Sequence, residues 1–491
     1  MRSENNVNIK ERNIILFIIS AISILGLFIL NKQNIYNYIF ALVYLVIIYK
    51  SFNESNKKSF YYITLLFAIM SITLGIRLKK YIGIDEQLNI YYVYLLIYII
   101  GFIAKAIKEK KKIFQINFVN VSFAIFALYT FLSFFIAKDK KIAIIELIYY
   151  GIMFCLVIMI VNENRSKRDI LQTLKFLGIV SLGMVIMGLF KIVTGIQLEP
   201  NSSYLPLGAP LSSIQPPFNR IPTLFFYNPN NYALVAVIVL IAFSILFISN
   251  TKYNKWLILL AIAIVEINVF FTRSRTGWIA TIISLVFISL VLLLRKKWKK
   301  AILTLVPIFM FCILFTGMES IKNASFLYDK LGELEEHVDE NGEVVDGPQI
   351  SIGSTGSINV RATLYVDILE GVFKEKNYLG FGAGNINEYI KMRDNTHGRY
   401  DPHCWWLEIL GDFGIVGFVS FTLGYFLLAF KLFIDFLKGS ELRYISLLCL
   451  ALLAVMSMLV ISPSSVLRIT PFWIVIALSL STSDLISDRS N

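Results

Sequence analysis

Long apolar runs recur along almost the whole chain, and they constrain its fold more than any other feature. Each is roughly 17–25 residues long, which is the length that a helix needs to cross the ~30 Å hydrocarbon core of a bilayer. Backbone groups in lipid must pair within the segment, and barrel strands would alternate apolar with polar residues, so these runs predict helices. We therefore expect an all-α, polytopic integral membrane protein with about 12–14 transmembrane helices.

The runs divide into expected spans with one large polar interruption. The expected spans are 13–30, 35–49, 60–76, 88–106, 118–137, 142–161, 170–195, 229–249, 256–272, 275–294, 301–317, 410–432, 443–461 and 469–481. The interruption predicts an extracytoplasmic loop domain that contains short helices. The expected units are 1–228, with the first spans and an outer loop; 229–317, with spans joined by an arginine-bearing outer turn; the loop domain 318–403; and the last spans, 404–491.

Basic residues cluster in alternate loops and predict the side of the membrane on which each loop lies. Lys105–Lys112 and Arg295–Lys300 are such clusters, which are typical of cytoplasmic loops. The bias predicts a cytoplasmic amino terminus. It also accounts for the net charge of +13 without a nucleic-acid partner, because the aromatic residues lie inside the spans. Segments 197–228, 272–275 and 318–403 are then expected on the outer face.

The polar interval is acidic and contains two helical patterns. It holds 15 Asp and Glu against 8 Lys and Arg. Val360–Phe373 carries apolar residues at helical spacing, and Asn385–Met392 predicts a second short helix. Gly380–Gly384 predicts a flexible turn between them. Asp329–Asp346 shows little periodicity and predicts an exposed loop.

Two arginines occupy a short outer turn between spans. Arg273 and Arg275 could anchor helix ends to lipid headgroups, although paired outer arginines run against the positive-inside bias. Alternatively they bind an anion, because a guanidinium donates forked hydrogen bonds that suit phosphate. Arg275 is expected at the amino-terminal end of a span, where free N–H groups also favour an anion.

Two further arginines, Arg361 and Arg220, could each be either a solvated loop residue or a residue that binds an anion. Asn359 is a plausible N-cap, which would place Arg361 in the first turn of a helix. A cation there opposes the helix dipole unless an anion is shared with it. Arg220 follows two prolines in an outer loop, where a structural role and a contact with acceptor or lipid phosphate are both open.

His403 is the best candidate for a general base. Its reference pKa of about 6.5 allows it to accept a proton near neutrality, and a helix start disfavours the imidazolium. A structural role for the residue is the alternative. Glu408 follows, and then Gly411, Gly414 and Gly417, which predict one close-packing helix face. The three histidines and four cysteines show no metal-ligand spacing.

Four motifs follow one another along the second half of the chain. They are Phe271–Trp278, Asn359–Tyr365, Asn377–Gly384 and Pro402–Glu408, and they fall roughly within 230–425. In order, spacing and sidedness the motifs resemble the O-antigen ligase and polysaccharide polymerase family. The resemblance implies a GT-C-like membrane glycosyltransferase on the outer face of the cytoplasmic membrane. The implied donor is an undecaprenyl-pyrophosphate-linked glycan, the acceptor is a glycan or lipid-linked glycan, and no metal or other cofactor takes part.

The resemblance also assigns roles to particular residues. Arg275 and Arg361 would hold the donor pyrophosphate, and His403 would activate the acceptor hydroxyl. Cys404 stands where the family commonly has asparagine after the histidine, which leaves the role of that position open. The candidate substrate-binding residues are Arg273, Arg220 and Glu408. Either Arg273 or Arg275 is the pyrophosphate ligand in this turn.

The chemistry expected from these residues is a single displacement with inversion, because no carboxylate pair for a covalent intermediate is apparent. A composition rich in Ile, Lys, Asn and Tyr suggests an AT-rich genome, often of a low-GC Gram-positive cell without lipid A, which favours a polymerase. An O-antigen ligase or a protein O-glycosyltransferase would use the same chemistry. A lipid-linked oligosaccharide flippase is the alternative of another class. The bilayer, a chain-length regulator and a flippase are the expected partners.

Overall fold

The computed structural model describes residues 58–70, 75–77, 87–109, 116–195, 220–226, 228–249, 251–319, 337–338, 344–345, 350–461, 463 and 465–490. The expected spans 13–30 and 35–49 lie outside the described residues, as does most of the Asp329–Asp346 stretch. Within the described part the chain is almost entirely helical, which confirms the all-α fold. Nine helices there are long and apolar enough to cross a membrane.

The helices of the membrane region follow the expected spans closely. In chain order they are α3 (Ser59–Ile69), α5 (Ile90–Glu109), α6 (Phe118–Leu132), α7 (Lys140–Glu163), α8 (Lys167–Thr194), α9 (Pro229–Ile248), α10 (Lys255–Phe271), α11 (Arg275–Leu294), α12 (Trp298–Leu303), α13 (Leu305–Glu319), α17 (Trp405–Lys438), α18 (Arg443–Leu459) and α19 (Thr470–Ser490). The polar interval adds α15 (Ser357–Leu369), a π-helical turn (Glu370–Lys374) and α16 (Ile386–Arg393).

Short polar side chains fix where several of these helices begin. The Asn117 side chain accepts from a backbone N–H of the first turn of α6, and Asp139 and Ser166 do the same for α7 and α8. Asn228 caps α9, whose first residue is Pro229, a residue that loses no hydrogen bond at that position. Apolar runs alone set the spans only approximately, and these caps set their first residues.

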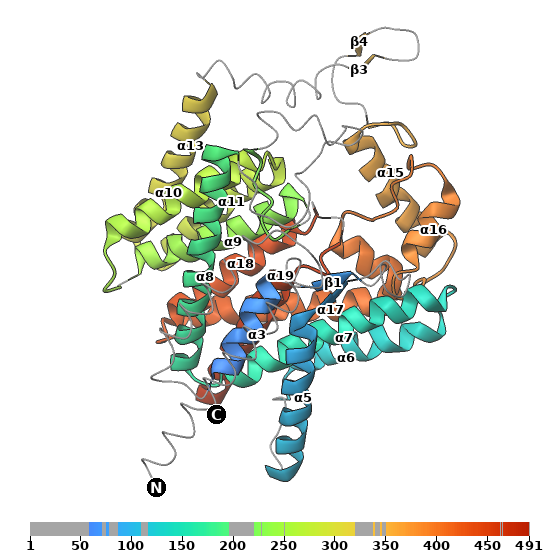
Figure 1. Ribbon diagram of the computed structural model, residues 1–491, viewed down its shortest axis with the longest axis horizontal. Helices are drawn as coiled ribbons and strands as arrows, with labels where there is room; N and C mark the ends of the chain where they lie inside the picture. Colours follow the sequence, from blue (N-terminus) through green and yellow to red (C-terminus); the bar gives the residue numbers. More distant parts are fainter. Residues whose placement is uncertain are drawn as a thin grey trace.

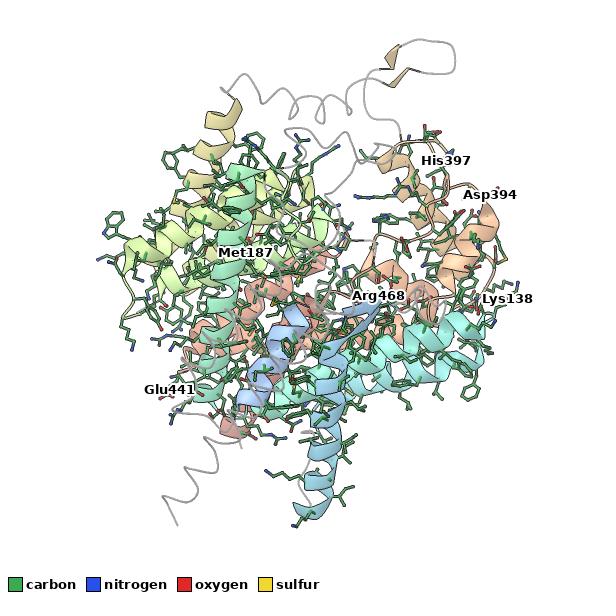
Figure 2. The ribbon with its side chains drawn as sticks, viewed as in Figure 1. Lys138, Met187, Asp394, His397, Glu441 and Arg468 are labelled. Atoms are coloured by element: carbon green, nitrogen blue, oxygen red, sulfur yellow. The ribbon has the colours of Figure 1, made fainter. Side chains whose placement is uncertain are left out.

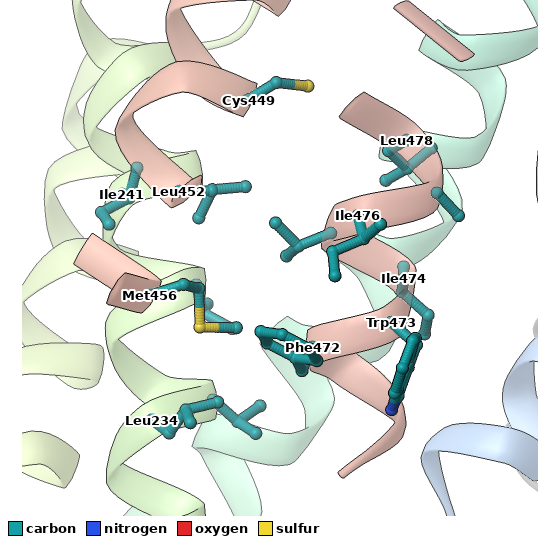
Figure 3. Packing of buried hydrophobic residues seen from close by; sticks show 14 of the residues in the cluster. Leu234, Ile241, Cys449, Leu452, Met456, Phe472, Trp473, Ile474, Ile476 and Leu478 are labelled. Atoms are coloured by element: carbon teal, nitrogen blue, oxygen red, sulfur yellow. The ribbon is translucent and has the colours of Figure 1, made fainter. Parts of the chain in front are cut away.

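The core lies where α18 and α19 pack against α9 and α17. Figure 3 shows Met456 of α18 and Phe472 of α19 pointing toward one another, with Leu234 of α9 beside them. On the other side α17 packs along α6, where the rings of Phe126 and Phe421 lie 5.0 Å apart. The helix α17 is thus held on two sides within the membrane region.

Several expected spans have different limits in the structure, including 469–481, whose helix α19 ends only at Ser490. The run 60–76 ends as a helix at Ile69, and Gly75–Arg77 instead forms strand β1, which pairs antiparallel with β2 (Gln87–Asn89). Strand pairing satisfies the backbone groups there that a longer helix would have satisfied. The expected span 410–432 is too short, because α17 begins at Trp405 and ends at Lys438. A second two-stranded pair joins β3 (His337–Val338) and β4 (Val344–Val345).

The helices α15 and α16 form a small unit at one end of α17, next to α6 and α7 (Figure 1). Its own core contains Leu364, Ile368 and Ile390, and Leu407 of α17 packs against it. At the outer edge of this unit (Figure 2), the His397 ring lies 2.9 Å from the Gly353 carbonyl oxygen. The expected helices over Val360–Phe373 and Asn385–Met392 are confirmed.

Candidate active site

The turn between α10 and α11 presents Arg275 at a helix start, as the sequence predicts. Ser274 caps α11, and its Oγ accepts a hydrogen bond from the Gly277 N–H at 3.2 Å. Thr272 tightens the turn by donating to the Val269 carbonyl at 2.6 Å. Arg273 has a left-handed backbone, with φ of 57°. Arg275 is therefore the first residue of α11, where free N–H groups and the positive end of the helix dipole favour an anion.

Arg361 lies in the second turn of α15, and not in the first turn as expected. The helix begins at Ser357 after Gly356, so Asn359 is inside the helix and is not its N-cap. The Asn359 side chain instead binds the preceding loop, accepting from the Ser351 N–H at 3.2 Å. It also donates to the Thr355 carbonyl at 3.0 Å. The positive φ of Gly356 lets the helix start earlier than the asparagine suggests.

The guanidinium groups of Arg361 and Arg275 lie close enough for their charges to interact. Burial lowers the pKa of Arg361, and the positive charge of Arg275 lowers it further, while Tyr365 acts in the opposite direction. Arg361 forms no hydrogen bond or ion pair within the described part of the chain. An arginine stays charged under such a shift. Two neighbouring cations, one of them half-buried and unpaired, therefore form a site that an anion would stabilise.

His403 lies two residues before α17, with Cys404 between them as the N-cap. Its backbone is left-handed, with φ of 51°, a conformation that costs energy and persists only where the surroundings impose it. The neighbouring residues are held from two helices. The Tyr365 hydroxyl of α15 donates to the His403 carbonyl at 3.4 Å, and the Trp405 N–H donates to the Val460 carbonyl at 3.1 Å.

Tyr365 connects the arginine pair to the histidine, a role that the sequence did not predict for it. It lies one helical turn after Arg361, and burial raises its pKa to about 12, with Cys404 raising it further and Arg361 lowering it. Tyr365 therefore interacts both with the guanidinium of Arg361 and with the segment of His403 and Cys404. The signal available in the sequence was the four-residue spacing from Arg361, which places both side chains on one helix face.

The region that contains these residues is similar to a known protein family. The O-antigen ligase family model matches residues 258–422, which include Arg275, Arg361 and His403. Residues 258–422, called the matched region below, are therefore similar to O-antigen ligases. No curated protein matches the chain. The family and the helices together indicate a multi-pass membrane enzyme that transfers or polymerises glycan from lipid-linked substrates.

A glycine-rich turn of the matched region attaches the α15–α16 unit to α17. The Phe381 N–H donates to the Gly411 carbonyl at 2.9 Å, and the Gly382 N–H donates to the Asp412 carbonyl at 2.8 Å. Asp412, which sequence reasoning did not select, accepts from the Gly384 N–H at 2.9 Å and the Ile386 N–H at 3.1 Å. The turn is thus a main-chain joint that places α15 and Arg361 beside the start of α17.

The expected close-packing face of Gly411, Gly414 and Gly417 is partly wrong. Gly411 does pack closely, against Ile386 of α16, and Gly417 lies against Phe413. Gly414, however, is not helical, with φ of 59° and ψ of −159°, and it interrupts α17. The interruption frees the Ile415 N–H, which donates to the Tyr378 carbonyl at 2.9 Å.

The remaining sequence candidates lie as follows. Glu408 is buried, and its Oε1 accepts from the Ser465 hydroxyl at 2.7 Å, which links α17 to the loop before α19. Arg220 precedes the matched region, is exposed, and forms no hydrogen bond or ion pair within the described residues. Arg273 is half-buried in the α10–α11 turn. The arrangement brings Arg275 and Arg361 together, and joins them to the His403 segment through Tyr365.

Proposed function

We propose that the protein polymerises undecaprenyl-pyrophosphate-linked oligosaccharide units on the outer face of the cytoplasmic membrane. The observation that carries the proposal is the pair of neighbouring cations, Arg275 at a helix start and the unpaired Arg361. A pyrophosphate offers two adjacent anionic groups, which would suit two guanidiniums and the free N–H groups of α11. Arg273, in the same turn, is the alternative ligand.

The proposed reaction is a single displacement at the anomeric carbon. The acceptor oxygen forms a bond to that carbon as the bond to the pyrophosphate oxygen breaks, with inversion. His403 takes the acceptor proton, and the negative charge that develops on the leaving pyrophosphate is stabilised by Arg275 and Arg361. The position of His403 before α17 supports a neutral imidazole, because the positive helix end disfavours the imidazolium.

A ligase that transfers a finished glycan to a different acceptor is the second candidate, because the matching family model describes O-antigen ligases. The two functions share the donor chemistry and differ only in the acceptor. Purified protein in liposomes with lipid-linked repeat units distinguishes them. A ladder of chain lengths supports the polymerase, and a single product formed only when another acceptor is added supports the ligase.

The assay needs variants that separate the site from the fold. Arg361→Ala is expected to slow product formation roughly 10²–10³-fold, the usual loss for one donor that stabilises developing charge. Arg399→Ala removes an exposed arginine of the same α15–α16 unit and is expected to change the rate of product formation little. Donor that crosses the bilayer without reaction, in wild type and in both variants, would refute the proposal in favour of a flippase.

A further inference from the structure

An apolar groove runs between α11 and α17, at the ends of these helices that are distant from the candidate active site. Its walls are formed by α11 from Phe287 to Leu294 and by α17 from Phe426 to Phe433, and Leu450 of α18 forms its floor. The groove has a volume of about 780 Å³, and every residue that lines it is apolar. Leu290 is 56% exposed and Phe430 is 62% exposed, so both walls face outward.

A cation closes one end of this groove. Arg295 directly follows α11, and its Nη1 donates to the Phe436 carbonyl of α17 at 3.0 Å. Its guanidinium also lies 5.6 Å from the centre of the Phe436 ring. The side chain therefore reaches from the end of one wall to the end of the other. Only one of its five donors is used by this hydrogen bond.

More positive charge follows immediately in the chain. Lys296, Lys297 and Lys299 are exposed, and together with Arg295 they form no ion pair within the described part of the chain. Asp435, the nearest acid in sequence to Phe436, accepts hydrogen bonds from the hydroxyls of Ser440 and Ser446. Arg295 and the three lysines outnumber Asp435, so the net charge at this end of the groove is positive.

The same loop contains an exposed aromatic residue. Trp298 is 61% exposed between the lysines. Tryptophan is enriched at the boundary between hydrocarbon and headgroups, so the basic end of the groove is at headgroup level. The apolar walls then lie in the hydrocarbon. A groove of this kind has the two parts that a phospholipid needs.

We propose that this groove binds an anionic phospholipid, with an acyl chain between α11 and α17 and its phosphate against Arg295 and the lysines that follow. Basic pockets between transmembrane helices recognise anionic headgroups in this way. The inference goes beyond the proposed function and does not depend on it. Arg275 begins α11 and Leu294 ends it, so the two ends are about 30 Å apart. One headgroup therefore cannot occupy both ends.

The test is native mass spectrometry of the full-length protein, purified in mild detergent with equal amounts of phosphatidylglycerol and phosphatidylcholine of the same chains. Phosphatidylglycerol is expected to be retained preferentially. Lys297→Gln is expected to reduce this preference about fivefold, the effect of one basic residue near an anionic surface. Lys252→Gln removes an exposed lysine from the α9–α10 loop and is expected to leave the preference unchanged.

A second pair of variants tests the groove itself. Leu290→Trp fills it and should reduce retention of both lipids, whereas Leu257→Trp replaces a similarly exposed residue of α10 that does not line it. Equal retention of the two lipids by the wild-type protein would overturn the proposal. So would displacement of phosphatidylglycerol by undecaprenyl phosphate, which would assign the groove to the lipid of the donor.

Discussion

Replacement of Gly414 by alanine should destabilise the protein markedly, because no other residue fits its conformation. With φ of 59° and ψ of −159° the residue lies in a region that only glycine adopts readily. A Cβ there would collide with the Tyr378 carbonyl oxygen and lie about 2.5 Å from the Gly380 nitrogen. The turn would have to move away, and the hydrogen bond from the Ile415 N–H to Tyr378 would be lost.

The expected magnitude follows from these two effects. Conformational strain costs about 1–3 kcal/mol, and the lost hydrogen bond costs about 0.5–1.5 kcal/mol. Their sum is about 2–4 kcal/mol, which for a chain of 491 residues corresponds to a melting temperature lowered by roughly 2–4 °C. The assay is thermal unfolding in one detergent at one scan rate, because unfolding of such a protein is scan-rate-dependent.

Gly178→Ala provides a control of opposite sign. Gly178 lies inside α8, and nothing lies within 4 Å of an added Cβ. Alanine is the better helix former by about 1 kcal/mol, so this variant should melt at the wild-type temperature or slightly above it. If both variants behave like the wild type, α17 is not interrupted at Gly414 and the reasoning is refuted.

Three further variants test the candidate active site and the α15–α16 unit. Arg361→Lys should retain only a small part of the wild-type rate of product formation at unchanged melting temperature, because lysine cannot donate the forked pair of bonds; wild-type turnover would contradict the pyrophosphate role. Tyr365→Phe should slow product formation by up to about tenfold, since the lost bond to His403 is worth about 0.5–1.5 kcal/mol, and an unchanged rate would exclude a positioning role. The pKa of Glu370 is lowered, first by its hydrogen bond from Arg393 and then by Lys374. Ionised Glu370 therefore stabilises the folded protein at pH values above its unfolded pKa of about 4.3. This stabilisation is lost as the pH falls through the lower pKa of the folded state. Glu370→Gln should therefore melt below wild type at pH 7, with a gap that narrows toward pH 3, and a constant gap would refute the assignment.

Much of the membrane region could be predicted from the sequence, because hydrocarbon imposes a strong rule on apolar runs. The spans 229–249, 256–272 and 275–294 correspond to α9, α10 and α11 within two residues at each end. The prediction failed for α17, which begins five residues before the expected span. Glu408 and Asp412 make its first turns polar, and only tertiary hydrogen bonds to Ser465 and the glycine turn allow them to be buried there.

The local placement of Arg275 could be predicted from the sequence, but the geometry of the candidate site could not. Arg275 at a helix start follows from a serine cap between two apolar runs, which is local information. The proximity of Arg361 to Arg275 depends on how the α15–α16 unit attaches to α17. That attachment is made largely by backbone groups, which the types of side chain in the sequence do not reveal. Asn359 was expected to cap a helix, but Gly356 allowed an earlier start. Such competition between two nearby start signals is decided by the surrounding loop.

The glycine-rich turn that joins the α15–α16 unit to α17 limits which sequence changes this unit can accept. Its hydrogen bonds join the N–H groups of Phe381, Gly382 and Ile415 to main-chain carbonyls, so they survive most side-chain replacements. The exposed residues of α15 and α16 can therefore be exchanged while the glycines and Asp412 hold Arg361 in place. The surface of this unit can thus vary in evolution without changes to its attachment to α17.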